Sequence, residues 1–128
     1  MNTTFLLVLL TLGDGGQINA AFVNTDSLNT CQNKSKMLGA VISTSGTKIV
    51  ENRCFVSDLN FTKFSHGQSD EEVRYDYAIL LSDDYVEVIQ SKNKMECTVN
   101  EENMALTNKG EVYCTTSSQN IKEIKNNA

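Results

Sequence analysis

The clearest pattern of apolar and polar positions lies in residues 73–99, a stretch dense in Tyr, Val, Ile and Leu. Two short polar breaks, at residues 82–84 and 91–94, divide this stretch into three parts. Short runs rich in β-branched and aromatic residues, bounded by turn-forming residues, are typical of β-strands. The pattern therefore predicts three consecutive antiparallel strands, a meander on which the rest of the chain packs.

Shorter elements are expected before this meander. They are a helix over residues 31–38, a strand over residues 40–42, a turn at residues 43–46, a returning strand over residues 47–56 and a further strand over residues 55–64. Asp26 or Ser27 is suited to cap the helix, and Gly39 is suited to end it. Residues 65–72 contain no apolar side chain, so they are expected to form an exposed loop.

After the meander, residues 100–110 carry the signals of a short helix, with Asn100 as its cap and Gly110 at its end. A hairpin turn at residues 108–110 is the alternative interpretation. A last strand over residues 111–115 is expected next. We therefore expect an α+β fold, mainly antiparallel sheet with one or two short helices, in a single domain over residues 21–117. A polar C-terminal tail over residues 118–128 completes the chain, and no internal repeat is recognisable.

The first twenty residues resemble an export signal in their pattern. Residues 5–12 form an apolar run, Gly-rich residues 13–16 break it, and Ala20 offers a small residue at a cleavage site. The run is too short to span a bilayer, so no stable membrane anchor is expected. The alternative is a buried hairpin formed by residues 5–12 and 17–23, since Asp-Gly at residues 14–15 is a good turn pair.

Four cysteines support export independently, because an even number of widely spaced cysteines is typical of a disulfide-bonded secreted protein. Their spacing contains no Cys-x-x-Cys motif, which disfavours zinc and thioredoxin-type chemistry. Three pairings are possible in principle. We expect Cys31 to pair with Cys54 and Cys97 with Cys114, because each pair brackets a segment that can fold back on itself.

The chain has a formal net charge of −5, which disfavours nucleic acid and anionic membranes as partners and favours a basic protein. Catalytic signals are few. His66 is the single histidine and stands in the expected exposed loop. Asp76 and Glu87 could in principle form a glycosidase carboxylate pair, although nothing in the sequence selects them. No cofactor or metal site is expected, and we do not expect an enzyme.

Tyrosines beside acidic residues give the most specific binding signal. Tyrosine provides a large contact area at low entropic cost, and carboxylates can meet a basic partner. The candidate partner-binding residues are Tyr75, Asp76, Tyr77, Asp83, Asp84 and Tyr85. The alternative is that these rings cover one side of a small core.

Together these features predict an exported, disulfide-stabilised domain that binds another protein. The most concrete version is a periplasmic inhibitor or immunity-type protein that blocks a basic secreted enzyme such as a cell-wall hydrolase. The absence of proline and the weight of Asn, Lys and Ile favour a bacterial source for such a protein. A secreted effector that binds a host receptor is the first alternative, and a small carboxylate-dependent hydrolase is the second.

Overall fold

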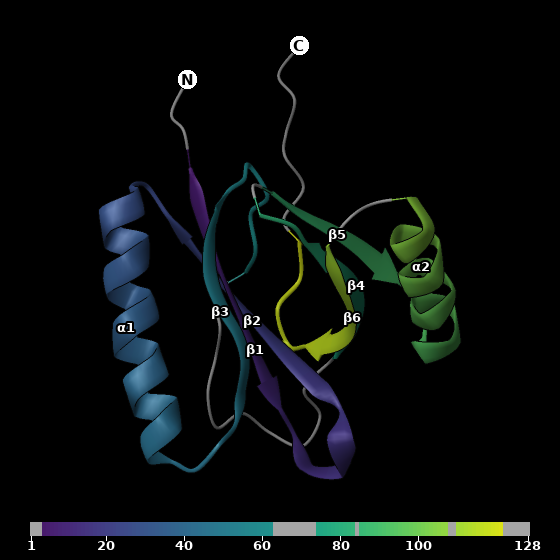
Figure 1. Cartoon of the computed structure of the whole chain (residues 1–128), viewed down its shortest axis with the longest axis horizontal. Helices are drawn as coiled ribbons and strands as arrows, with labels where there is room; N and C mark the ends of the chain where they lie inside the picture. The colour runs from purple at the N-terminus through teal and green to yellow at the C-terminus, as the bar shows by residue number, and fades with distance from the viewer. Residues whose placement is uncertain (1–3, 63–73, 84, 108–109, 122–128) are drawn as a thin grey trace.

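The structure, a computed structural model, describes residues 4–62, 74–83, 85–107 and 110–121 (Figure 1). Its elements are β1 (Phe5–Leu12), a 3-10 turn (Asp14–Gly16), β2 (Ile18–Thr25), α1 (Leu28–Thr44), β3 (Ile49–Val56), β4 (Tyr75–Leu81), β5 (Val86–Ser91), α2 (Lys94–Thr107) and β6 (Glu111–Ser117). The strands form one sheet in the order β3-β1-β2-β6-β4-β5, antiparallel throughout except for the parallel pair of β2 and β6. The expected α+β fold with a mainly antiparallel sheet is confirmed.

The two halves of the chain share one connectivity, which the sequence did not reveal. In each half a β-hairpin is followed by a helix and by a third strand that returns to pair with the first strand of the hairpin. Disulfides Cys31–Cys54 and Cys97–Cys114 join the helix to the third strand in both halves. The expected cysteine pairing is therefore confirmed, and each bridge closes its own half.

The correspondence between the halves extends to individual positions. Each bridged helix cysteine is the fourth residue of its helix. Ser27 accepts a hydrogen bond from the backbone N–H of Thr30, and Asn93 accepts one from the N–H of Glu96, so equivalent residues cap both helices. The ladders match as well, because Leu7 pairs with Cys54 and Val23 as Ala78 pairs with Cys114 and Ile89. Equivalent positions share polarity and geometry more than identity, which is why the repetition is not visible in the sequence.

One face of the sheet forms the main core. Its buried side chains come from several strands and from the segment after β3: Leu6, Val8, Leu10, Ala20, Phe22, Phe55, Phe61, Tyr77, Ile79 and Leu81. Phe22 and Phe61 stack with their ring centroids 3.8 Å apart, and Tyr77 meets both rings edge-on. Cys54 and Cys114, the strand cysteines that are bonded to the helices, point to the opposite face of the sheet. The helices therefore cover the outer side of a sheet that curls around this core (Figure 1).

The first twenty residues lie inside this sheet. β1 pairs with both β2 and β3, and five of its eight residues are buried. This is the hairpin that we named as the alternative to an export signal. A chain cleaved after Ala20 would lose all of β1 and the first part of β2, so the folded domain includes residues 5–25.

Several expected elements differ from the structure, including the helix expected over residues 100–110, which begins earlier, at Lys94. The third strand of the meander is instead the start of α2, which Asn93 caps; Met95 and Val99 alternate as in a strand but are exposed. The first helix is longer than expected and absorbs residues 40–42, because Gly39 does not end it. Residues 57–62 form no strand, although Phe61 makes an isolated antiparallel bridge with Ile121.

That bridge shows that residues 118–121 fold back onto the domain and are not a loose tail. Gln119 in particular is buried among β2 and the segment after β3. The expected exposed loop over residues 65–72, with His66, lies outside the described residues, as do residues 122–128.

Candidate functional site: an acidic cleft

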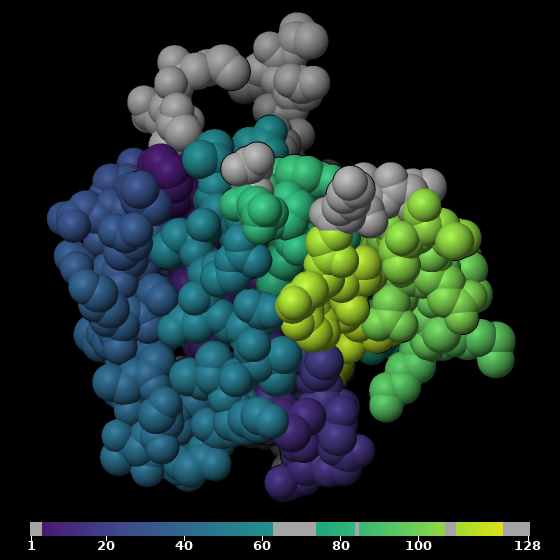
Figure 2. All heavy atoms as spheres, in the orientation of Figure 1, coloured from purple at the N-terminus to yellow at the C-terminus, as the bar shows by residue number. Residues whose placement is uncertain are grey.

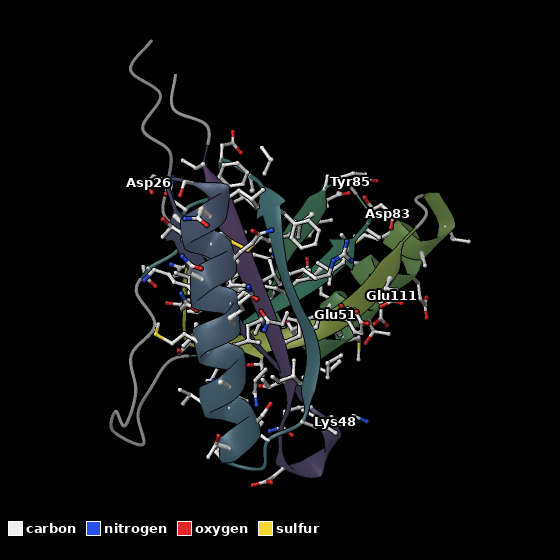
Figure 3. The ribbon with its side chains drawn as sticks, turned by 60° about the vertical axis from the view of Figure 1, so that its left-hand side comes forward. Asp26, Lys48, Glu51, Asp83, Tyr85 and Glu111 are labelled. Atoms are coloured by element: carbon white, nitrogen blue, oxygen red, sulfur yellow. A yellow bond between two sulfur atoms is a disulfide. The ribbon has the colours of Figure 1, made fainter. Side chains whose placement is uncertain are left out.

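A small polar cleft opens where β3 approaches the β4–β5 turn and the start of β6. We call it the acidic cleft; it has a volume of about 320 Å³ and is lined by Glu51, Arg53, Leu81, Ser82, Asp83, Gly110 and Glu111. Figure 3 shows Glu51, Asp83 and Glu111 on one side of the molecule, with Tyr85 close to Asp83. The cleft therefore combines residues from three separate parts of the chain.

The curl of the sheet brings these residues together. Glu51 and Arg53 pair with Leu10 and Val8 of β1, so their side chains lie on the inner face of the sheet. Glu111 pairs with Leu81, which places it on the same face at the start of β6. Because the inner face is concave, side chains of the edge strand β3 and of β6, three strands away, meet across it.

Two carboxyl groups in the cleft share one phenol. The Tyr113 hydroxyl oxygen lies 2.9 Å from Oε2 of Glu51 and 2.5 Å from Oε2 of Glu111. One hydroxyl proton can be donated to only one of these carboxylates at a time. The two glutamates therefore compete for the same donor.

Their surroundings separate the two acids in pKa. Burial, helped by the neighbouring Glu111, raises the pKa of Glu51 above its ordinary value. The hydrogen bond from Tyr113 lowers the pKa of Glu111. Burial and both carboxylates raise the pKa of the Tyr113 phenol. As the pH falls, Glu51 therefore takes up a proton before Glu111 does.

Arg53 is the one cation that lines the acidic cleft among the described residues. Its Nη2 donates to the carbonyl oxygen of Ser82 at 3.0 Å, and its guanidinium carbon lies 4.8 Å from the centroid of the Phe55 ring. These contacts tie β3 to the β4–β5 turn. With one guanidinium against three carboxylates, the cleft keeps a negative potential that suits an ammonium or guanidinium group of another molecule.

The structure separates the partner-binding residues that the sequence suggested. Tyr77 is fully buried and donates to the carbonyl oxygen of Gln119 at 2.7 Å, and burial raises its pKa to about 12. Tyr75 packs against the main core. Their rings therefore cover the core, which is the alternative given above.

The remaining candidates are divided between two surfaces. Asp83 lines the acidic cleft, and Tyr85 is 42% exposed beside it. The N–H of Tyr85 donates to the Ser82 hydroxyl at 3.2 Å, which holds this turn in place. Asp76 lies on the outer face near α2, away from the cleft. Asp84 falls outside the described residues.

Sequence reasoning missed four residues of this site, namely Glu51, Arg53, Glu111 and Tyr113. All four stand in segments expected to be strands, at the period of two that places side chains on one face. The missing information was the curl of the sheet, which joins residues about 60 positions apart in the chain.

The carboxylate pair considered from the sequence does not form. Asp76 pairs with Ser91 and Glu87 with Leu80, so the two acids lie four ladder positions apart. At ~3.3 Å per residue this separates them by roughly 13 Å. Glycosidase carboxyl groups lie ~5–9.5 Å apart. Asp76 and Glu87 are thus too distant to act as such a pair.

Searches of protein-family models, of curated proteins and of solved structures return no match to this chain. Among the described residues no three His, Cys, Asp or Glu side chains are grouped so that they could hold a metal ion. Neither helix in the described part of the chain is long and apolar enough to cross a membrane. The two disulfides are compatible with an exported, disulfide-stabilised small domain.

Proposed function

We propose that this chain is an exported binding domain that recognises a basic protein through the acidic cleft. The observation that carries the proposal is the group of three carboxylates, Glu51, Asp83 and Glu111, around one opening. The single lining cation, Arg53, is already engaged with Ser82 and Phe55. Among the described residues that line the cleft, three carboxylates face this one guanidinium, so an incoming Lys or Arg side chain would meet an excess of negative charge.

The size of the cleft supports a protein partner over a small substrate. At about 320 Å³ it lies at the lower limit of small-molecule pockets, which span roughly 300–1,000 Å³. It can accept one side chain of a partner, while the exposed Tyr85 beside it adds contact area at the rim. The most concrete version of this role is a periplasmic inhibitor or immunity-type protein that blocks a basic secreted enzyme such as a cell-wall hydrolase.

We infer binding without turnover as the role of the acid pair. Glu111 is exposed, and the hydrogen bond from Tyr113 lowers its pKa, so it keeps its charge at the rim of the cleft. Glu51 lies deeper, and burial raises its pKa, so its charge is the first to be lost as the pH falls.

The proposal is tested with a basic lysozyme as the probe enzyme, using calorimetry at low and physiological salt together with an assay of cell-wall lysis. Wild-type protein is expected to bind and inhibit, and the double variant D83N/E111Q is expected to bind at least tenfold more weakly. The matched control is D26N/E102Q, which removes the same number of charges from exposed sites elsewhere. Asp26 lies far from the cleft (Figure 3).

Equal weakening by the cleft and control variants would show that only net charge matters, which contradicts a specific site. If lysozyme is not inhibited at a hundredfold excess, the cell-wall version is wrong. The broader role is then tested by capture from an exported-protein fraction. A partner must bind the wild type and D26N/E102Q but not D83N/E111Q, and the absence of any such protein would refute the proposal.

A further inference from the structure

A second cavity, larger than the acidic cleft and opposite in chemistry, lies between α1 and the β1–β2 hairpin. We call it the α1 groove; its volume is about 620 Å³. Its apolar lining includes Ala21, Val23, Met37, Leu38 and Val41. Most of this surface is apolar, and its volume falls within the roughly 300–1,000 Å³ range of small-molecule sites.

The groove exists because α1 is attached to β3 and not to β2. On the β3 side, disulfide Cys31–Cys54 joins the two elements, and Ser35 and Asn52 exchange hydrogen bonds of 2.7 and 3.0 Å. Gly39 allows a close approach there, since a Cβ at this position would lie 2.9 Å from the Asn52 side chain. Figure 2 shows α1 (blue) packed directly against β3 (teal).

On the β2 side the helix stands away from the sheet. Cys31 is the single buried residue of α1. Met37 and Val41 are 57% and 62% exposed, and the strand beneath them carries the small residue Ala21. The disulfide and the contacts with β3 thus hold α1 in place on one side and leave a preformed apolar channel on the β2 side.

Among the described residues, the charged side chains that line the groove are both positive. Lys34 lies on the α1 side and Arg74 on the side of β2 and β6, and no carboxylate appears among the lining residues. The chain as a whole carries 16 acidic against 11 basic residues. The Arg74 guanidinium is positioned by Asn19 and Thr116, to which it donates at 3.0 and 3.3 Å. A preformed apolar channel with cations at two walls is complementary to an amphiphilic anion.

We propose that the α1 groove binds a single-chain carboxylate, a free fatty acid, with its alkyl chain beneath α1 and its carboxylate at Lys34 and Arg74. The alkyl chain of the ligand would replace water on Val23, Leu38 and Val41, which line the groove and are not buried. The head group gains charge-assisted hydrogen bonds from Lys34 and from Arg74, whose guanidinium Asn19 and Thr116 already hold in position. This site is independent of the acidic cleft and of the protein partner proposed above.

The test uses the full chain and dodecanoate, below its micelle concentration, in a calorimetric titration. Saturable binding of one molecule is expected. Affinity should rise about fourfold for each CH₂ from decanoate upward until the groove is full. Dodecyltrimethylammonium, which has the same chain and the opposite charge, is expected to bind at least a hundredfold more weakly.

Variants separate the two parts of the site. K34Q/R74Q should weaken dodecanoate binding at least tenfold, whereas K48Q, which removes an exposed cation outside the groove, should leave it unchanged. A21L places bulk on the groove floor and should block the alkyl chain. Val41 is mostly exposed, so V41Q offers a second variant that preserves the fold, and it should weaken binding severalfold. Circular dichroism and the absence of free thiols verify that each variant is folded.

Several results would overturn the proposal. Equal binding of dodecanoate and dodecyltrimethylammonium would show that the cations play no part. Binding to phosphatidylglycerol vesicles without binding of free dodecanoate would assign the surface to a membrane. Unchanged affinity in both A21L and V41Q would place the alkyl chain elsewhere on the protein.

Discussion

Replacing Gln119 tests how the two halves of the sheet are joined. β2 and β6 are paired at only two positions, Ile18 with Thr115 and Asn19 with Thr116. Beyond these two positions, the Gln119 side chain makes the hydrogen bonds to the β2 backbone that a neighbouring strand would otherwise make. Its Oε1 accepts from the N–H of Phe22 at 2.8 Å, and its Nε2 donates to the carbonyl oxygens of Phe22 and Thr62, each at 2.7 Å. Gln119 is 1% exposed, so water cannot replace these bonds.

The cost of losing this side chain follows from the three backbone groups that it satisfies. Methionine has nearly the same length but offers none of these hydrogen bonds. A buried polar group left without a partner costs ~1–3 kcal/mol. The Thr62 carbonyl is only partly buried, and the methionine gains some apolar contact. We therefore expect Q119M to reduce the free energy of unfolding by roughly 3–5 kcal/mol, a large share of a typical ~5–15 kcal/mol.

The measurement is urea unfolding followed by circular dichroism and tyrosine fluorescence, with both disulfides intact. Gln90, an exposed residue of β5, provides the control variant Q90M, which should change stability by less than ~0.5 kcal/mol. The variant Q119E tests the same hydrogen bonds through pH. At neutral pH its carboxylate faces the carbonyl oxygens of Phe22 and Thr62, and protonation restores one donor. The loss of unfolding free energy relative to wild type should therefore become smaller as the pH falls. Equal stabilities for Q119M and Q90M would refute the role of Gln119.

Three further predictions concern the bridges, the first strand and the shared phenol. Replacing either pair of bonded cysteines by serine should lower the free energy of unfolding by about 3 kcal/mol, since the cysteines are 23 and 17 residues apart. Hydrogen exchange should show that α1 opens in C31S/C54S. In C97S/C114S, α2 should stay closed, because its buried Met104 still anchors it. Deletion of residues 1–20 should abolish cooperative unfolding, and a cooperative transition in that variant would contradict the central place of β1. Because the pKa of Glu51 is raised in the fold, its contribution to stability is fully present below the unfolded pKa of about 4.3 and is lost as the pH rises through the folded pKa. E51Q should therefore lose less stability than wild type between pH 4 and pH 8, with E102Q as the control, and identical pH profiles would refute this assignment.

Local patterns predicted much of the fold. Strands β3, β4 and β5 follow from alternation and turn residues, and the disulfides follow from the closeness of each cysteine pair along the chain. β1 was harder, because a central strand that is buried on both faces has the same unbroken apolar composition as an export signal. The start of α2 has a misleading local pattern, because Met95, Cys97 and Val99 alternate as in a strand, whereas the structure shows a helix that Asn93 caps at Glu96.

Long-range geometry was out of reach for the sequence. Glu51 and Glu111 meet only because the sheet curls, and no local pattern encodes that curvature. The α1 groove forms because α1 packs more closely against β3 than against β2. Contacts of Ser35 and Gly39 with Asn52 fix this arrangement. Tyr77 and Gln119 likewise form one buried unit although they are 42 residues apart.

Because each disulfide stays within its own half, each bond can form without a cysteine of the other half. Cys31 and Cys54 both precede Cys97, so a chain that entered an oxidising compartment from its N-terminus would present the first native pair before the second. In such a compartment a wrong partner would not yet be present when the first bond forms.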